Sequence, residues 1–407
     1  MLRPLAALLA AAVGLAAPTA AQPKEDPLDR FTYKLSTTPA PAPAPGLRTE
    51  FRVRATERLP GNAALDYYRA VVLLPAWPQD PEKSGTLRKD LYERWPELSL
   101  DELPVDDVTA YLKQFADGFK ALDAAAKRDT VDWRQEVKPD PVAQGGFLQE
   151  IQKFREVGAL NRLRVRRDLA RNKFDDAALA VRSGFQFGKA IGEGPVTIQM
   201  LVGLAVCQVS VGGSIDFIGR PGSPNLYWAL ASLPRPLIDP RPALEGEEEF
   251  MERGIRAQVP YSKETAAACR AIWDDQRRAF TLPYPRATAA LDKIAARTEE
   301  LKKERSEPAV ALFALGVPAF RKCYHAHARL DRWMAGLMAV EAVRLHAAEA
   351  KGTPPAALAD ITAAPVPPDP YTGRPFEYAA RADGFTLTAP IADGIGSGFR
   401  VEITFRR

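Results

Sequence analysis

The chain has 407 residues, 46% of them hydrophobic and 26% charged, with 55 Lys and Arg against 51 Asp and Glu. The formal net charge of +4 is small and spread along the chain, so it predicts no surface for nucleic acid or for an anionic membrane. One basic concentration, from Lys153 to Lys173, has arginines on more than one helix face, which is typical of a solvated amphipathic helix; a site for phosphate or an acidic partner is the alternative.

Residues 1–21 have the organisation of a cleavable export signal. Arg3 supplies the positive start, an apolar run follows it, and the small residues Thr19 and Ala21 stand at the cleavage position. The run is shorter than the ~20 strongly apolar residues of a spanning helix, and an uncleaved signal anchor is the alternative. We therefore expect an exported protein of the periplasm or the extracellular space, and signal removal changes the charge balance from 55 − 51 = +4 to 54 − 51 = +3.

Residues 22–60 are predicted to be an extended N-terminal segment rich in Pro and Ala. The run from Pro39 to Pro45 cannot be helical and is typical of a semi-rigid, polyproline-like spacer. Short extended stretches are expected on either side of it, at residues 31–35 and 51–53.

Residues 61–350 follow the apolar period of helices, with Gly and Pro between them. We therefore predict a mainly α protein whose helical domain is one large layer system or two closely joined ones. The most apolar later stretch, 198–211, is interrupted by Gln208 and followed by Gly212, so no membrane span is expected there. Helices are predicted from residue 62 and at residues 105–126, 147–172, 175–191, 195–211, 261–280, 288–304 and 318–350.

Residues 351–407 change from the helical period to alternation. Apolar side chains fall on one face and polar ones on the other, as in 399–405, and Asp383 with Gly384 supplies a hairpin turn. This pattern predicts a small C-terminal three-stranded antiparallel β module, packed on the last long helix.

Residues 169–184 resemble the turn between the two helices of a tetratricopeptide repeat. Phe174 stands where the family closes its first helix, and Asp175 stands where it caps the second. The resemblance implies a helical hairpin and makes Phe174 a candidate binding residue on a shallow concave surface.

Residues 340–361, followed by Asp369, Pro370, Gly373 and Tyr378, resemble the C-terminal part of the G-type pseudopilins of type II secretion. In that family a helix and a Pro-bounded loop lead into a small sheet. The apolar prepilin start is missing from this chain, so filament assembly is not implied.

The chain as a whole is similar to a family of exported proteins of unknown function from bacteria with large genomes. The similarity lies in residues 192–195, 223–246, 367–376 and 401–405. It implies no catalytic residues.

Local motifs of several enzyme classes do not occur in the sequence. We find no Gly-x-Ser-x-Gly, Ser-x-x-Lys or His-Glu-x-x-His. Gly184, Gly188 and Lys189 are only superficially like a phosphate loop, because the spacing is one residue short and Ala190 replaces Ser or Thr. No cofactor is expected.

Cys323 and His327 are weak candidates for a copper or zinc site, since they share a helix face at a four-residue step. The favoured interpretation is that no metal binds and that His327 is a hydrogen-bonded core residue. Cys207, Cys269 and Cys323 all lie in apolar helical contexts and are predicted to be buried, although the exported compartment permits one disulfide.

Two further groups suggest ligand chemistry. Glu248 and Glu252 share a helix face and could act on a glycan or hold a cation; a solvated first turn is the alternative. Tyr227 and Trp228 precede the Pro-rich segment 234–242 and could form a platform for a peptide or glycan, or they could staple a loop to the core.

These patterns favour an exported helical scaffold or protein-interaction protein without catalytic activity. Its binding residues would be Tyr227, Trp228 and Phe174, and its partner a protein of the envelope. The alternatives are an envelope hydrolase that acts on glycan or peptide through Glu248 or Glu252, and an accessory protein of a secretion or pilus-like apparatus.

Overall fold

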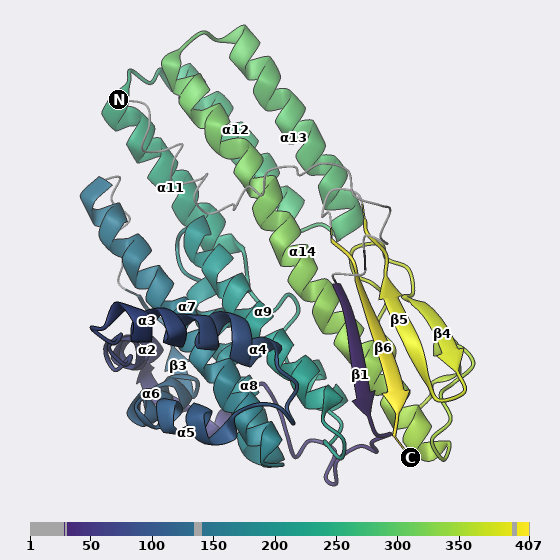
Figure 1. Cartoon of the computed structure of the whole chain (residues 1–407). Coiled ribbons are helices and arrows are strands. Elements are labelled where there is room, and N and C mark those ends of the chain that lie inside the picture. The colour runs from purple at the N-terminus through teal and green to yellow at the C-terminus, as the bar shows by residue number, and fades with distance from the viewer. Residues whose placement is uncertain (1–27, 29–30, 134–140, 393–396, 407) are drawn as a thin grey trace.

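The computed structural model describes residues 28, 31–133, 141–392 and 397–406, except for the side chains of 141–151 and 318–319. The predicted export signal at residues 1–21 lies outside these ranges. Helices make up 61% of the structure, which confirms the prediction of a mainly α protein. Figure 1 shows a layer of short helices, a central group of three long helices, a helical bundle and a sheet.

The short helices lie at the lower left of Figure 1. Asn62 and Asp80 begin two of them, because a side-chain oxygen of each accepts a backbone N–H of the first turn, from Ala64 (3.0 Å) and Glu82 (2.9 Å) respectively. The elements of this layer are η2 (Ala55–Glu57), β2 (Leu59–Asn62), α2 (Ala63–Val72), α3 (Pro81–Lys89), the π-helix η3 (Asp90–Arg94), α4 (Trp95–Glu97), α5 (Val105–Lys113), α6 (Ala116–Ala125) and β3 (Arg128–Thr130).

The single helix predicted over 105–126 is two helices, α5 and α6. The backbone leaves the helical region at Phe115, with φ −107° and ψ 15°. The buried Phe115 ring lies where a Cβ on Gly118 would be, so only Gly fits at that position. Packing of one aromatic ring against the next turn therefore accounts for the break.

Three long helices, α7 (Pro141–Ala170), α8 (Phe174–Gly192) and α9 (Thr197–Gly219), form the centre of the molecule. Helices α8 and α9 approach closely through glycines, since a Cβ on Gly188 would lie 2.5 Å from Cys207 Sγ and 2.9 Å from the Gly203 carbonyl oxygen. Gly188 is thus a packing residue. By length and composition, α9 is the one described helix that could cross a membrane. In its apolar 18-residue stretch, 67% of the residues are buried inside the protein.

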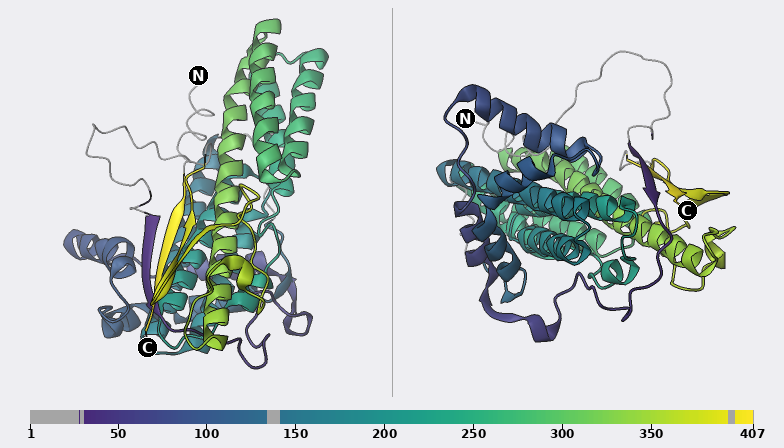
Figure 2. Two further views of the ribbon diagram at one scale, coloured as in Figure 1. Left: turned by 90° about the vertical axis from the view of Figure 1, so that its right-hand side faces the viewer. Right: turned by 60° about the horizontal axis from the view of Figure 1, so that its bottom comes forward.

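The bundle contains the longest helix, α14, which runs from the tip of the bundle to the far end of the sheet (Figures 1 and 2). It begins at Pro308, before the predicted residue 318, because Pro suits the first helical position and Val310 and Phe313 are buried against Trp273 and its neighbours. The elements of this part are α10 (Tyr227–Ala231), α11 (Arg241–Gln258), α12 (Lys263–Phe280), α13 (Tyr284–Glu304), α14 (Pro308–Glu349) and η4 (Leu358–Asp360).

The sheet has four strands and is mixed, so the prediction of a three-stranded antiparallel module is wrong. Strands β4 (Glu377–Arg381), β5 (Gly384–Ala389) and β6 (Phe399–Phe405) are antiparallel, and β1 (Thr32–Thr37) adds in parallel to β6. Without β1 the apolar strand β6 would present an unpaired edge. The pairing joins opposite ends of the chain, and no local pattern could predict it.

The sheet lies against α14. The Trp333 ring stacks on Phe399 of β6, with centroids 3.9 Å apart, and a Cβ on Gly336 would meet the same Phe399 ring. The Tyr33 ring of β1 also contacts Trp333, in an edge-on arrangement with ring centroids 5.2 Å apart. Aromatic stacking of this kind fixes how the sheet sits on the helix.

A buried ion pair on α14 holds two distant loops. Glu341 and Arg344 are both 0% exposed, and two guanidinium–carboxylate contacts of 2.9 and 3.0 Å join them. Glu341 also accepts from Asn225 Nδ2 (2.7 Å), and Arg344 donates to the carbonyl oxygens of Thr38 and Ser223 (3.1 Å each). The pair therefore connects the N-terminal segment to the loop before α10.

Candidate functional site

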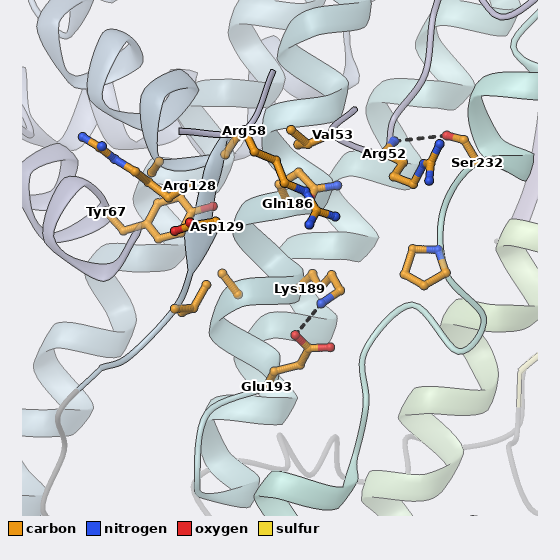
Figure 3. A pocket seen from close by; sticks show the side chains of 15 residues that line it. Arg52, Val53, Arg58, Tyr67, Arg128, Asp129, Gln186, Lys189, Glu193 and Ser232 are labelled. Atoms are coloured by element: carbon orange, nitrogen blue, oxygen red, sulfur yellow. Dashed lines mark hydrogen bonds and ion pairs between the residues drawn. The ribbon is translucent and has the colours of Figure 1, made fainter. Parts of the chain in front are cut away.

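A cavity of about 380 Å³ lies between the N-terminal segment, α8 and the turn after α10 (Figure 3). Its walls come from four separate parts of the chain. The lining residues are Arg52, Val53, Arg58, Tyr67, Ala125, Ala126, Arg128, Asp129, Val131, Gln186, Lys189, Ala190, Glu193, Ser232 and Pro234.

The N-terminal wall is fixed through its backbone. Ser232 Oγ accepts the N–H groups of Phe51 (3.0 Å) and Arg52 (3.1 Å), and Gln186 Nε2 donates to the Phe51 carbonyl oxygen (2.8 Å). The Phe51 ring is buried in the main core, against Phe185 of α8. Because the chain is anchored at this point, the exposed Arg52 side chain lies at the cavity and not in a free linker.

On the β3 side, Arg128 is already engaged. Its Nε lies 2.8 Å from Asp66 Oδ2, and its Nη1 donates to the Pro60 carbonyl oxygen at 2.6 Å. Asp129 accepts the Gly61 N–H at 3.0 Å through one carboxylate oxygen. These bonds tie β2 to β3, and the Asp129 carboxylate has no cationic partner among the described residues.

On the α8 side, Lys189 and Glu193 form an ion pair one helical turn apart, at 2.5 Å. Glu193 uses its other carboxylate oxygen to accept the Asp239 N–H, at 3.3 Å. The pair therefore links α8 to the turn that follows α10.

Two groups at the cavity have no partner among the described residues. The Arg58 guanidinium is exposed and makes no hydrogen bond or ion pair there, and the same holds for the Tyr67 hydroxyl. Tyr67 is 1% exposed, its ring packs against Trp133 and Phe187, and burial raises its pKa. The phenol thus stays neutral and can donate one hydrogen bond into the cavity.

Counted over the lining residues alone, the charge of the cavity is positive, because four cationic side chains face two carboxylates, which gives 4 − 2 = +2. Three of the four cations have a carboxylate partner: Arg128 pairs with Asp66, Lys189 with Glu193, and Arg52 lies 3.6 Å from Glu50. Arg58 is therefore the lining cation without a carboxylate partner among the described residues.

The described lining does not suggest catalysis. Among its residues none is a His or a Cys, and the Ser232 hydroxyl donates to the Ala229 carbonyl oxygen (2.6 Å) with no base beside it. Within the described ranges no group of three His, Cys, Asp or Glu is placed to hold a metal ion. What the arrangement can do is hold an anionic group between arginines.

Tyr227 and Trp228 do not form an exposed platform. Tyr227 is 2% exposed and donates its hydroxyl to the Pro365 carbonyl oxygen, while Trp228 is partly buried and lies edge-on to it at 5.0 Å. They staple the loop before β4 to the core, which is the second of the two interpretations offered by the sequence.

Phe174 lies at the first position of α8. It is partly buried, and its ring packs on Phe217 of α9 with centroids 5.8 Å apart. Phe174 does not line the cavity. The structure thus gives it a packing contact between two helices.

Glu248 and Glu252 do not meet Tyr227 or Trp228. Each carboxylate is paired, Glu248 with Arg277 and Glu252 with Arg256, at 2.7 Å in both cases. They line a second hollow of only about 10 Å³, beside Tyr261 and Trp273. The groups of the hydrolase hypothesis are therefore not brought together.

His327 has no nitrogen left for a metal. Its Nδ1 is 2.7 Å from the Tyr284 hydroxyl, and its Nε2 is 2.8 Å from the Ile238 carbonyl oxygen. Burial raises the pKa of the Cys323 thiol to about 12, so this thiol remains protonated. The structure supports the interpretation of His327 as a hydrogen-bonded core residue.

The three cysteines are free and buried, each on a different helix. Burial raises the pKa of each thiol, and only thiolates react readily. We predict that Cys207, Cys269 and Cys323 are alkylated at neutral pH on the order of 100-fold or more slowly in the native protein than in denaturant. Mass spectrometry of the labelled protein measures this, and fast native labelling of any thiol would contradict it.

In comparisons with protein-family models, curated proteins and solved structures, no match to this chain was found. The three resemblances seen in the sequence stay predictions. The cavity residues were missed by sequence reasoning, because Arg52 and Arg58 lie in a segment taken for a linker and Tyr67 lies in the apolar stripe of a helix. The one local signal was the group of three arginines within residues 51–58.

Proposed function

We propose that the protein is an exported, non-catalytic binding protein whose cavity holds an anionic group of its ligand. One observation carries the proposal: the Arg58 guanidinium and the Tyr67 side chain line the same cavity, and neither the guanidinium nor the Tyr67 hydroxyl has a partner among the described residues. An acceptor oxygen on a ligand could take a hydrogen bond from both groups. The export part of the proposal is supported by the composition of residues 1–21.

Carboxylate and phosphate are the groups that this lining suits. Arginine presents a planar fork of donors that matches either of them, and Arg52 and Arg58 could bind one oxygen anion together. A cavity of about 380 Å³ is within the range of small-ligand sites. The apolar walls at Val53, Ala126 and Pro234 would cover the rest of the ligand.

The first test is binding of small anions to the purified mature protein. We expect sulfate, phosphate or a dicarboxylate such as succinate to raise the midpoint of thermal unfolding and to bind in calorimetry. Arg58→Gln should weaken binding about tenfold or more, because a hydrogen bond to a charged group contributes about 1.5–3 kcal/mol. Arg278→Gln, at an exposed surface pair with Asp275, is the matched control and should bind as the wild type does.

Tyr67→Phe separates binding from folding. The hydroxyl has no partner within the described ranges of the chain, so its removal should leave stability unchanged or raise it, while affinity for the anion falls about threefold to tenfold. Equal affinity of wild type, Arg58→Gln and Tyr67→Phe for every anion tested would contradict the proposed site.

A second experiment distinguishes two sources of the anionic group, a protein partner and a small molecule. In the scaffold form of the proposal, the group is an acidic side chain or chain end of a protein partner, and affinity purification from envelope fractions should recover one stoichiometric protein with wild type but not with Arg58→Gln. In the small-molecule form, mass spectrometry of the native protein should instead show a bound carboxylate or phosphate compound.

A further inference from the structure

Arg58 and Asp129 carry opposite charges on the lining of one cavity, and neither has a charged partner there. The Arg58 guanidinium has no hydrogen bond or ion pair among the described residues, and the Asp129 carboxylate has no cationic partner among them. It follows that the two groups do not pair with each other. Figure 3 shows Asp129 on the Tyr67 side of the cavity, while Arg58 reaches in from the N-terminal segment. The cavity therefore offers one position to an anion and another to a cation.

The backbone on both sides of Arg58 is fixed. Before it, the Glu57 carboxylate accepts from the Arg182 guanidinium of α8 at 2.8 Å. After it, the Leu59 N–H donates to the Lys127 carbonyl oxygen, also at 2.8 Å. Since the chain is held at both neighbours, only the Arg58 side chain has to be ordered when a ligand binds. Such preorganisation lowers the entropic cost of binding.

Asp129 is held in place by the pairing of β2 with β3. Its Oδ1 accepts the Gly61 N–H at 3.0 Å, and the Thr130 hydroxyl donates to the Gly61 carbonyl oxygen at 2.9 Å. These bonds keep the Asp129 carboxylate on the β3 side of the cavity, out of ion-pair range of Arg58. The Asp129 side chain is exposed there, so a ligand can reach it.

The buried part of the lining is apolar. Val53, Ala125, Ala126 and Ala190 are buried, and the ring of Tyr67 belongs to the same surface. Packing of an apolar group of a ligand against these side chains is favourable, because it removes apolar surface from water. The Tyr67 hydroxyl has no partner among the described residues and adds one donor to this surface. A well-matched ligand therefore combines charged groups with an apolar part.

A simple anion or a simple cation matches this lining only in part. A simple anion pairs with Arg58, but Asp129 repels it and stays without a partner. A simple cation pairs with Asp129, but it enters a lining whose formal charge is 4 − 2 = +2. A ligand that carries both charges is complementary at both positions.

We infer that the ligand of the cavity is a zwitterion, namely an amino acid or a short peptide with an apolar side chain. The inference rests on the proposed binding function and names the class of its ligand. The ligand carboxylate accepts from the Arg58 guanidinium and the Tyr67 hydroxyl, and the ligand ammonium donates to the Asp129 carboxylate. The apolar side chain covers Val53 and Ala126.

Calorimetry with matched probes tests whether both charges are needed. Leucine, valine and phenylalanine, and their dipeptides, carry both charges; the N-acetyl derivatives lack the ammonium, and the amides lack the carboxylate. We expect an amino acid or a dipeptide to bind wild type about tenfold or more tightly than its own two derivatives, because each derivative gives up one charged hydrogen bond. Tighter binding of the amino acid identifies a free amino acid as the ligand, and tighter binding of the dipeptide identifies a peptide.

Asp129→Asn separates the two charged positions in the protein. Asn keeps an acceptor oxygen for the Gly61 N–H and removes the charge. Affinity for the zwitterion should fall about tenfold, whereas affinity for sulfate should rise, because a repelling carboxylate is gone. A misfolded variant would lose both affinities. Asp107→Asn, at an exposed carboxylate of α5 outside the cavity lining, is the matched control and should bind both probes as wild type does.

Failure of this inference and failure of the proposed function give different results. If sulfate binds but no zwitterion binds more tightly than its N-acetyl derivative, the ligand is not a zwitterion and the proposed anion site stands. The same conclusion follows if folded Asp129→Asn changes the affinities for zwitterion and sulfate in the same direction. If neither an anion nor a zwitterion binds to wild type, the proposed function is wrong and this inference with it.

Discussion

Glu341→Ala is expected to destabilise the protein by about 3–5 kcal/mol, because it leaves a buried guanidinium without its carboxylate. Arg344 is 0% exposed, and it donates two hydrogen bonds to the Glu341 carboxylate and one to the Ser223 carbonyl oxygen. Removal of Glu341 also leaves the Asn225 amide and the Leu226 N–H without their acceptor. A loss of this size is a large fraction of the ordinary stability of a folded domain, about 5–15 kcal/mol. Urea unfolding followed by circular dichroism measures it.

A double variant and a surface variant provide the controls. Replacing both partners, Glu341→Met with Arg344→Met, should be less damaging than Glu341→Ala alone, because no unpaired charge remains in the core. Arg297→Ala breaks a surface pair with Glu304 whose side chains are 48% and 53% exposed, and it should change stability by no more than about 1 kcal/mol. If Glu341→Ala unfolds like Arg297→Ala, the buried pair does not hold the loops together.

Helices with an apolar face were predictable from the sequence, and those without one were not. The helix predicted at 175–191 is α8, Phe174–Gly192, whose buried residues recur at helical spacing. By contrast α3, Pro81–Lys89, buries none of its residues, so no apolar period revealed it. Its only local signal was the Asp80 cap before Pro81.

Long-range pairing set a second limit on prediction. The alternation of apolar and polar residues in β6 predicted a strand. Its partner β1 comes from the other end of the chain, and nothing in the pattern of residues 32–37 indicates that they pair with β6. The same limit applies to Tyr227, whose hydroxyl finds its acceptor at Pro365. A sequence can show that Tyr227 needs a partner, but not whether that partner lies in the protein or in a ligand.

The cavity is the clearest example of a feature that the sequence could not predict. Its unpaired groups, Arg58 and Tyr67, come from different elements, and each is ordinary in its own segment. Their significance depends on which contacts are missing after folding, and missing contacts leave no periodic signal in a sequence. Conversely, the glycines of α8 have only a superficial likeness to a phosphate loop, already rejected from the sequence on spacing, and the structure shows that Gly188 is needed for helix packing.

Gly203→Ala is expected to destabilise the protein by about 2 kcal/mol or more, because the added methyl group would enter the backbone of α8. The new Cβ would lie 2.5 Å from the Gly188 carbonyl oxygen and closer still to the backbone of Gly192. No side chain can rotate away from such a contact, so the two helices must separate, and overpacking of this kind is destabilising. Thermal unfolding and native-state hydrogen exchange of α8 and α9 would report the change.

Gly213→Ala on the same helix is the matched control, and it should have the opposite sign. Its Cβ would meet only the side chains of Val165 and Val181, at 3.6 to 3.7 Å, which is ordinary van der Waals distance. Replacement of a helical Gly by Ala then stabilises by roughly 0.5–1 kcal/mol, because Gly loses more backbone entropy on folding. If both variants change stability in the same direction, close backbone contact between α8 and α9 is not what selects Gly at position 203. If their signs differ as expected, the glycines of the two helices act by shape alone, since neither substitution changes charge or removes a hydrogen bond.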